Sequence, residues 1–333
     1  MSERPLCSIS LDVDDLWSYM KIRGDQRWTE RPSYLPRFLP VALDTLESLA
    51  LRTTFFFVGF DATVESNAPV LASLVARGHE VGNHSFEHES WLHLYSRAQL
   101  EEEIEKAENA IAAATSQRPR GFRGPGYSWS ETLLEVLAGR DYLYDASTLP
   151  TYLGPLARAY YFATAGKGMS KTPERKTLFG TFRDGLRPVN AYEWALRDGR
   201  SLLEIPVTTI PGIKAPFHFS YLLFLARKSE ALAFGYLRTA LAICRATGVE
   251  PSFLLHPLDL MGGDEVSELA FFPGMDLPSR RKRELFSKAL TILGEHHTPV
   301  TMSAHANAIR ARARLARRTP DAAPTVAAHS AAR

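Results

Sequence analysis

The chain has 333 residues, of which 45% are hydrophobic and 23% charged, and its formal net charge at pH 7 is +2. This composition excludes a disordered chain and is sufficient for a large core, in one large α/β domain or two smaller ones. The near-neutral charge argues against a dedicated nucleic-acid-binding protein. The two cysteines, Cys7 and Cys244, exclude a disulfide scaffold and are compatible with a reducing compartment.

Short apolar runs alternate with segments of helical periodicity along most of the chain. The runs predicted as strands are CSISLDV from Cys7, TTFFFVGF from Thr53, HEVGNHS from His79, GFRGPG from Gly121, YLYDAS from Tyr142, LLEIPVTT from Leu202, SFLLHPL from Ser252 and TPVTMSA from Thr298. Helices are predicted over 37–51, 68–77, 97–114, 130–139, 229–247 and 279–295. Repeated strand–helix units predict a parallel sheet, in which chemistry lies at the carboxyl ends of the strands.

Two segments depart from this alternation. Residues 151–200 contain many aromatic residues and nine Lys/Arg against four Asp/Glu, and we expect a lid-like insertion in a single barrel domain over 5–305. Residues 306–333 form an Ala/Arg-rich tail. We expect its last part, from Thr319, to be disordered because it cannot bury enough apolar surface.

The first residues, MSERPLCSISLDVDD, lack the charged start and long apolar stretch of a secretory signal. No run of 18 apolar residues occurs, so no transmembrane helix is predicted. We therefore expect a cytoplasmic protein of a bacterium-like cell.

Two histidines four residues apart, His84 and His88 in GNHSFEH, are the strongest chemical signal in the chain. Taken alone, they would more simply be two surface histidines. Asp12 and Asp14 end an earlier apolar strand, and side chains two residues apart on a strand point to the same side. Two imidazoles and one carboxylate form the ligand set of a hydrolytic metal site, and the spare carboxylate can act as a base.

Three further polar residues end apolar runs. Arg123 in GFRGPGYSW either is an exposed side chain at a turn or holds a catalytic carboxylate ionised. The glycines after it allow backbone N–H groups to approach a substrate oxygen. His256 in SFLLHPLD would ordinarily be a core histidine, but Asp145 could make it a general acid by supplying a negative charge.

Other residues give weaker signals. Trp129 follows the GFRGPG motif and either lines a pocket or packs in the core. Four histidines have no partner that the sequence identifies: His218, His296, His297 and His305.

In order and spacing, these motifs together resemble those of the polysaccharide deacetylase family (carbohydrate esterase family four, the NodB-homology domain). The resemblance spans roughly residues 5–305, with 151–200 not covered. It implies an α/β fold, a distorted (β/α) barrel, that removes N- or O-acyl groups from sugars. It also implies one divalent metal ion, Zn2+ first, with Co2+, Mn2+ or Ni2+ as alternatives.

The resemblance assigns a role to each motif. The metal ligands would be Asp14, His84 and His88, with Asp12 as the base. Arg123 would hold Asp12, and Asp145 would orient His256 as the acid. Oxyanion or substrate contacts would come from the residues after Arg123, namely Gly124, Gly126, Tyr127 and Trp129.

Two departures from the family pattern leave alternatives open. Val13 separates Asp12 from Asp14, where the commonest first motif has adjacent aspartates. Asp15, expected to cap a helix or support the site, could therefore share the ligand role. Gly126 stands between proline and Tyr127, so the N–H group that binds the oxyanion is not fixed.

These features predict a metal-dependent hydrolase that removes an acetyl or formyl group from a sugar nitrogen. The absence of a signal sequence favours a glycan precursor or a nucleotide- or polyprenyl-phosphate-linked sugar on the cytoplasmic side, as for cytoplasmic lipid-linked sugar deacylases of the family. The alternatives are a hydrolase of a non-sugar linear or cyclic amide, a non-catalytic carbohydrate-binding protein with a structural metal, and a metal phosphoesterase.

The apolar segment 217–243 and the basic insertion before it suit an anionic membrane surface. We therefore expect peripheral membrane contact through 151–243, with a core helix plus a solvated lid as the equal alternative. The expected partner is a sugar or glycolipid substrate. The sequence predicts no oligomeric state.

Overall fold

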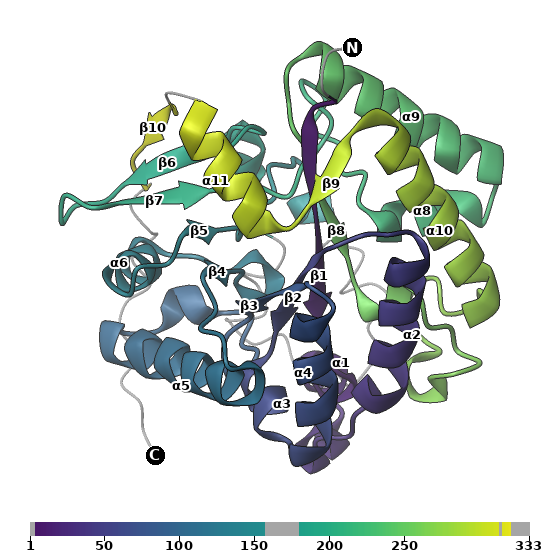
Figure 1. The fold of residues 1–333 in the computed structure, drawn as a ribbon, viewed down its shortest axis with the longest axis horizontal. Helices are drawn as coiled ribbons and strands as arrows, with labels where there is room; N and C mark the ends of the chain where they lie inside the picture. The colour runs from purple at the N-terminus through teal and green to yellow at the C-terminus, as the bar shows by residue number, and fades with distance from the viewer. Residues whose placement is uncertain (1–3, 157–179, 313–314, 321–333) are drawn as a thin grey trace.

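The computed structural model describes residues 4–156, 180–312 and 315–320. Within them, ten strands form a mostly parallel sheet in the order β10-β6-β7-β5-β4-β3-β2-β1-β8, with β9 beside β1 (Figure 1). The strands are β1 Leu6–Val13, β2 Thr54–Phe57, β3 Glu80–Asn83, β4 Gly121–Phe122, β5 Tyr144–Asp145, β6 Tyr192–Ala195, β7 Ser201–Glu204, β8 Ser252–Leu255, β9 Thr298–Val300 and β10 Arg317–Arg318. The β6–β7 pair is antiparallel, and the other pairs are parallel.

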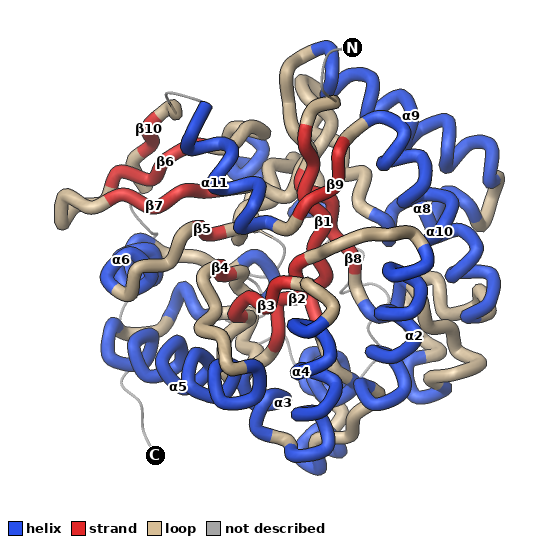
Figure 2. Tube along the Cα trace, in the orientation of Figure 1, coloured by secondary structure: helices blue, strands red, loops and turns tan. Residues whose placement is uncertain are grey.

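Helices lie around the outside of the strands (Figure 2). Their bounds are α1 Leu16–Arg23, α2 Leu35–Ser48, α3 Gly59–Thr63, α4 Ala68–Ala76, α5 Arg97–Thr115, α6 Glu131–Gly139, α8 Phe219–Ala226, α9 Glu230–Ala246, α10 Ser279–His296 and α11 Met302–Arg312. Helices α5 and α6 lie on the side of β3 to β5, and α8, α9 and α10 lie on the side of β8.

The two ends of the curved sheet approach each other just after β7. The backbone N–H of Val207 donates to the carbonyl of Thr148 at 2.9 Å, next to β5. The N–H of Thr208 donates to the carbonyl of Ser252, the first residue of β8, at 3.1 Å. The N–H of Ser252 donates in return to the Thr208 hydroxyl at 2.8 Å. These bonds bring the β5–β7 side of the sheet to β8, and the predicted distorted (β/α) barrel is confirmed.

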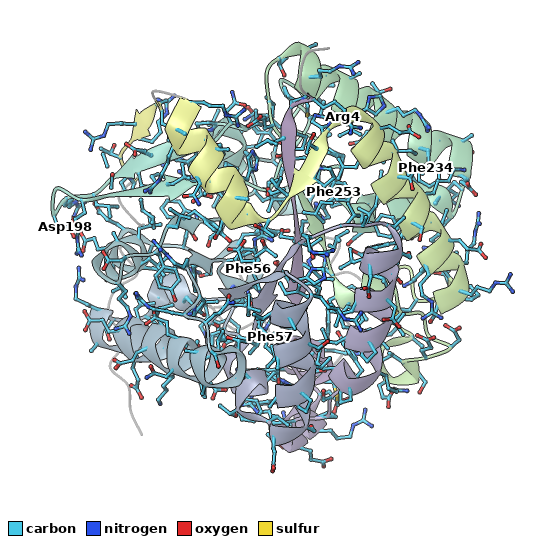
Figure 3. The ribbon with its side chains drawn as sticks, viewed as in Figure 1. Arg4, Phe56, Phe57, Asp198, Phe234 and Phe253 are labelled. Carbon is cyan, nitrogen blue, oxygen red and sulfur yellow. The ribbon has the colours of Figure 1, made fainter. Side chains whose placement is uncertain are left out.

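Side chains of β1 alternate between two environments, as the period of a strand requires. Ile9 and Leu11 join the largest apolar cluster with Phe55 and Phe57 of β2. Ser10 and Asp12 are also buried but lie on the other face. Phe56 lies on that second face too, and Figure 3 shows Phe56 and Phe57 near the centre of the molecule. The barrel interior is therefore partly polar, which allows it to hold charged groups.

The predicted strands and helices are found, although several strands are shorter than predicted. The strand predicted for LLEIPVTT is shorter than expected, because β7 ends at Glu204. The prediction of TPVTMSA as one strand was wrong, because α11 begins at Met302. Helices α1, α3, α8 and α11 were not among the predicted helices. The first five residues of α1 are all buried and α8 is almost entirely apolar, so neither shows the helical alternation of apolar and polar residues. Much of the expected insertion, residues 157–179, lies outside the described residues, as does the tail from 321.

Candidate active site

The polar motifs lie at one edge of the barrel. Asp12 is the penultimate residue of β1, and Asp145 is the last residue of β5. His84, Arg123 and His256 directly follow β3, β4 and β8. Because these strands run parallel, their carboxyl ends meet at the same edge. The topology therefore brings together residues that are far apart in sequence.

Asp14, His84 and His88 form a compact cluster at this edge. The Asp14 Oδ1 atom lies 2.9 Å from His88 Nε2 and 3.3 Å from His84 Nε2. One donor atom from each residue lies within 4.8 Å of the other two. Both histidines are almost fully buried. The structure therefore places two nitrogen donors and one oxygen donor where a single cation could contact all three.

The proton positions in the cluster also fit a cation. His84 Nδ1 lies 2.7 Å from the backbone carbonyl of Arg123, which can only accept a hydrogen bond. The Nδ1 atom therefore carries a proton, and in the neutral ring the lone pair of Nε2 faces the Asp14 carboxylate. Two acceptors that face each other need a positive charge between them, which either a metal ion or a second proton on His84 supplies. A backbone carbonyl that fixes the tautomer of a ligating histidine is a common arrangement around metals.

Electrostatics at the cluster favour positive charge. Burial alone would raise the pKa of Asp14, but the charge of His88 and hydrogen bonds from His84 and His88 hold it well below its usual range. Burial alone would lower the pKa of His84, but its hydrogen bond to Asp14 and the charges of Asp12 and Asp14 raise it. The cluster therefore keeps a carboxylate ionised in a buried place, as a metal ligand requires.

Aromatic and polar neighbours hold the cluster in position. The Trp17 ring meets His88 edge-on, with ring centroids 6.4 Å apart, and its indole N–H donates to Asp61 at 2.7 Å. Burial and the nearby charge of Asp14 raise the pKa of Tyr19 well above its usual range. Asp15 accepts from the backbone N–H of Leu16 at 2.7 Å and caps α1. Among the described residues Asp15 is not in the cluster of possible ligands, so its capping role is the one that the contacts support.

Asp12 lies beside the cluster, and one oxygen of its carboxylate accepts a hydrogen bond. Arg123 is completely buried, and its Nη1 donates to Asp12 Oδ1 at 2.8 Å and to Ser10 at 2.8 Å. The Arg123 Nε donates to the carbonyl of Ala146 at 3.0 Å. Asp12 Oδ2 has no hydrogen bond within the described part of the chain. Arg123 therefore fixes one oxygen of Asp12 and leaves the other available for a proton.

The neighbours of His256 differ from the expected ones. Its Nδ1 lies 3.3 Å from the Ser220 hydroxyl and 3.9 Å from Asp259 Oδ2. Ser220 also donates to Asp259 Oδ1 at 2.8 Å, and Asp259 Oδ2 accepts from the His256 backbone N–H at 2.8 Å. In residues 4–156 and 180–312, no hydrogen bond or ion pair joins Asp145 to His256. The carboxylate beside His256 is that of Asp259.

Asp145 instead belongs to a buried acidic pair. Its Oδ1 accepts from the Ser147 hydroxyl at 2.6 Å, and Glu204 occupies the facing position on β7. Burial and the charge of Asp145 raise the pKa of Glu204 well above its usual range. The expected contact between Asp145 and His256 is thus replaced by a contact within the sheet, because β5 pairs directly with β7, which carries Glu204.

The turn after Arg123 uses most of its own N–H groups. The N–H of Gly124 donates to the Ser147 hydroxyl at 2.8 Å, and that of Tyr127 donates to the carbonyl of Gly124 at 3.0 Å. The N–H of Gly126, a residue with φ of 59°, has no hydrogen bond to the described residues. Of the candidates in this turn, Gly126 is therefore the one whose N–H could bind an oxyanion.

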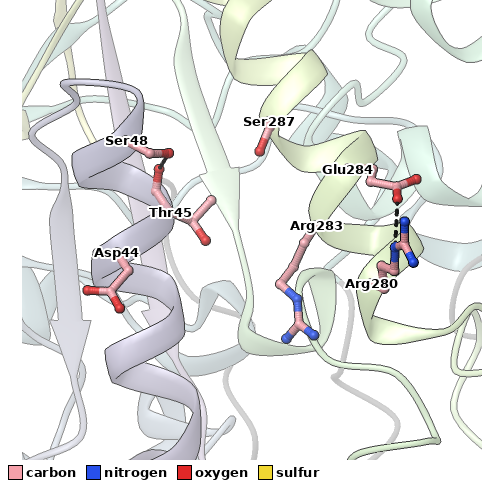
Figure 4. A pocket seen from close by; sticks show the side chains of 7 residues that line it. All are labelled: Asp44, Thr45, Ser48, Arg280, Arg283, Glu284 and Ser287. Carbon is pink, nitrogen blue, oxygen red and sulfur yellow. Dashed lines mark hydrogen bonds and ion pairs between the residues drawn. The ribbon is translucent and has the colours of Figure 1, made fainter.

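Trp129 packs against an apolar cluster that contains Phe122 and Trp194. Its ring stacks on Trp194 with centroids 5.0 Å apart, and the Arg187 guanidinium lies 4.3 Å from it. These contacts support core or rim packing. A separate surface groove lies between α2 and α10 (Figure 4), and none of the candidate site residues lines it.

Sequence reasoning missed two residues of the acid side, Ser220 and Asp259. Asp259 follows His256 by three residues in LLHPLD, and a carboxylate at that spacing can cap the short helix that begins after the histidine. That spacing was a usable signal. Ser220 gave none, because it lies in the apolar α8, far from His256 in sequence.

Comparison with known proteins bears on the family. Residues 8–144 match the family model of polysaccharide deacetylase. The predicted resemblance to that family is confirmed over this stretch of the chain. It is 33% identical over 104 residues to the chitooligosaccharide deacetylase of Sinorhizobium fredii, covering 31% of this chain and 47% of that protein. It is 24% identical over 178 residues to the peptidoglycan deacetylase of Helicobacter pylori, covering 51% of this chain and 57% of that protein.

The match to the chitooligosaccharide deacetylases thus spans about half of their length. Among solved structures, one from Mycobacterium smegmatis named for the polysaccharide deacetylases aligns with a TM-score of 0.60 at 19% identity, covering 94% of this chain and 93% of that one. The Puue allantoinase aligns with a TM-score of 0.55 at 14% identity, covering 93% and 91%. These two likenesses concern the fold.

Proposed function

We propose that the protein is a metal-dependent hydrolase that removes an acyl group, acetyl or formyl, from a sugar nitrogen. One observation supports this most strongly. Asp12, with a free oxygen, lies beside a cluster of one carboxylate and two histidines, and Arg123 holds it there. A purely structural metal would need the cluster but not a second, positioned carboxylate.

The residues of this chain divide the reaction between them. Asp14, His84 and His88 would hold one divalent ion, which when bound polarises the acyl oxygen and lowers the pKa of water. Asp12 would take the proton of the attacking water through its free oxygen. The N–H of Gly126 would donate to the oxygen that becomes negative, and one such donor is worth about 3 kcal/mol in the transition state. His256 would give a proton to the departing amine, which leaves poorly without one.

The test is an assay of acyl release by the purified full chain. The protein is stripped with a chelator, reloaded in turn with Zn2+, Co2+, Mn2+ or Ni2+, and incubated with N-acetylglucosamine oligomers, formylated amino sugars and non-sugar amides, both linear and cyclic. Acetate or formate release from the sugars that depends on an added ion supports the proposal. Release only from the non-sugar amides would assign the protein to the alternative class. No release with any ion would reject an enzymatic role.

Asp259 is the residue whose replacement tests the acid side. We expect Asp259→Asn to lower kcat/KM for an amide substrate by roughly 10-fold to 100-fold. This loss is smaller than loss of the acid itself would cause, because a positioned acid contributes on the order of 10²–10⁴-fold. Asparagine cannot stabilise the positive charge that His256 carries as the acid, and it holds the ring less firmly through Ser220. The loss should be larger for amide substrates, whose amine needs a proton to leave, than for an ester with a good leaving group.

Asp145→Asn is the matched comparison for that experiment. It removes a charge beside Glu204 and should leave the ratio of amide to ester rates unchanged. The opposite pattern, with the ratio changed by Asp145→Asn and not by Asp259→Asn, would restore Asp145 as the partner of His256.

A lipid-linked sugar on the cytoplasmic side of a membrane is the substrate that we propose within this class. No helix among the described residues is both long and apolar enough to cross a bilayer. Exposed large hydrophobic side chains nevertheless gather in 151–243, where six of the nine described ones lie: Leu156, Phe182, Leu186, Ile213, Phe224 and Leu232. Exposed apolar groups in a segment with basic residues suit an anionic membrane surface.

Flotation with vesicles tests this contact. The full chain should float with vesicles that contain anionic phospholipid, and less with neutral ones. Phe224→Ser combined with Leu232→Ser should reduce flotation, whereas Phe271→Ser, an exposed aromatic outside the segment, should not. Equal recovery of the protein in solution with both kinds of vesicle would contradict the membrane contact.

A further inference from the structure

A histidine that the proposed mechanism does not use lies beside His256. His218 immediately precedes α8 and occupies its N-cap position. Its ring centroid lies 6.2 Å from that of His256, and the two planes are inclined at 61°. The Tyr221 ring meets His218 edge-on at 4.7 Å. Ser220, on the same helix, contacts His256. The start of α8 therefore forms a wall of the site on the side of the acid.

Neither ring nitrogen of His218 is matched within the protein. The Nδ1 atom is buried without a partner, and no described residue forms a hydrogen bond with Nε2. The buried His305, in contrast, is matched: it contacts Ser8 at 3.1 Å and Glu250 at 3.2 Å. A buried polar group without a partner typically costs about 1–3 kcal/mol. His218 is 6% exposed, so its surroundings are not completely closed.

The charge state of His218 limits what it can bind. Burial, with the positive charges of His256 and Arg123, lowers its pKa to about 3, so the ring is neutral. A neutral imidazole has one donor and one acceptor, and so does a hydroxyl group. An anion would match only the donor, and an ammonium group only the acceptor. A hydroxyl is therefore the ligand that fits.

The distance between the two histidines fits a shared ligand atom. Hydrogen bonds join heavy atoms about 3 Å apart, so rings whose centroids are 6.2 Å apart do not bond directly. A single oxygen between them could contact both. His256 Nδ1 already contacts Ser220, so Nε2 is the ring nitrogen of His256 that has no hydrogen bond to the described residues.

We propose that His218 binds a sugar hydroxyl on the leaving-amine side of the scissile amide and thereby selects hydroxylated amines as substrates. This inference rests on the proposed function and names a specificity-determining residue for it. His218 transfers no proton in this role. It holds the amine side of the substrate next to His256, which delivers the proton.

The experiment combines His218→Phe with substrates that lack single hydroxyls. Phenylalanine keeps a ring against Tyr221 and removes both nitrogens, and the metal content and thermal melting of the variant are recorded alongside. The substrates are an N-acetylglucosamine oligomer and analogues deoxygenated at one position of the acetylated residue. We expect one analogue to cost the unmodified enzyme about 10-fold or more in kcat/KM and the variant less than about 2-fold.

His297→Phe is the matched control. His297 is also a buried histidine, with both nitrogens unpartnered, but it precedes β9, whose start pairs with the start of β1, at the opposite end of the barrel. This variant should discriminate among the analogues as the unmodified enzyme does.

Each outcome decides the question. Loss of discrimination in His218→Phe alone supports the inference. If His218→Phe and the unmodified enzyme discriminate equally between the oligomer and its deoxygenated analogues, the inference is overturned. It is also overturned if the unmodified enzyme has the same kcat/KM for every analogue as for the oligomer. An unmodified enzyme that releases no acetate from any sugar with any ion overturns the proposed function itself, which is a different result.

Discussion

Asp12→Asn is expected to lower kcat by on the order of 10²–10⁴-fold or more, while the protein retains its metal. Asparagine has the same shape and can still accept a hydrogen bond from Arg123, which holds Asp12 Oδ1 at 2.8 Å. The amide cannot take a proton from water, so the base is lost. The three ligands of the cluster are unchanged, and metal content per chain should therefore equal that of the unmodified protein.

The measurement pairs acetate release with metal analysis of the same preparation. Asp264→Asn is the control, because Asp264 accepts from Ser279 at the start of α10 and its loss should affect stability rather than turnover. Removing the charge of Asp12 leaves the buried Arg123 without its counter-ion, so some loss of stability is expected in the variant. Asp12→Asn that turns over at the normal rate would show that the Arg123–Asp12 pair is structural and that another group is the base.

The clustering of Asp14, His84 and His88 could be predicted because it follows from the two-residue period of a strand and from the topology of the sheet. Side chains at Asp12 and Asp14 share a side of the chain because a strand alternates every second residue. His84 follows another apolar strand of the same parallel sheet, so it must lie at the same edge. Neither step requires knowledge of side-chain packing, and the short His84–His88 spacing needs only a local turn.

The partner of His256 could not be predicted in this way. Asp145 ends a strand like the other candidates, and the sequence gives it the same signal. Its contacts depend on which strand lies next to β5, and the structure places β7 there with Glu204 at the facing position. The negative charge of Asp145 raises the pKa of this second acid, in addition to the effect of burial. Asp259 then supplies the carboxylate at His256 through a turn whose shape depends on local hydrogen bonds.

The donor for the oxyanion depends on a similar local detail. Three glycine or tyrosine N–H groups follow Arg123 within a few residues, and the sequence does not say which of them are used by the turn. Gly124 is occupied because Ser147, two residues beyond the end of β5, reaches across to it. The contacts between the ends of β4 and β5 must be known before the N–H of Gly126 can be identified as the free one.

His84→Ala is expected to abolish both metal binding and activity. Loss of a residue that hydrogen-bonds to a metal ligand typically weakens metal binding by roughly 10–100-fold. Loss of the ligand itself should weaken metal binding by more than that. A ligand that binds only the folded state stabilises it, by about 2.7 kcal/mol at a concentration 100 times its Kd. Zinc should therefore raise the melting temperature of the unmodified, metal-stripped protein and leave that of His84→Ala almost unchanged.

The control distinguishes a lost ligand from a lost histidine. His93 lies in the same region of the chain, but its Nδ1 contacts the Ser128 hydroxyl at 2.8 Å and it is outside the cluster. His93→Ala should keep the response to zinc. If His84→Ala also kept that response, the ion would be held without His84, and the lone pair of Nε2 that faces Asp14 would need another explanation. Because Asp12 and His256 would then act around a differently placed ion, the roles proposed for both would have to be reassigned together.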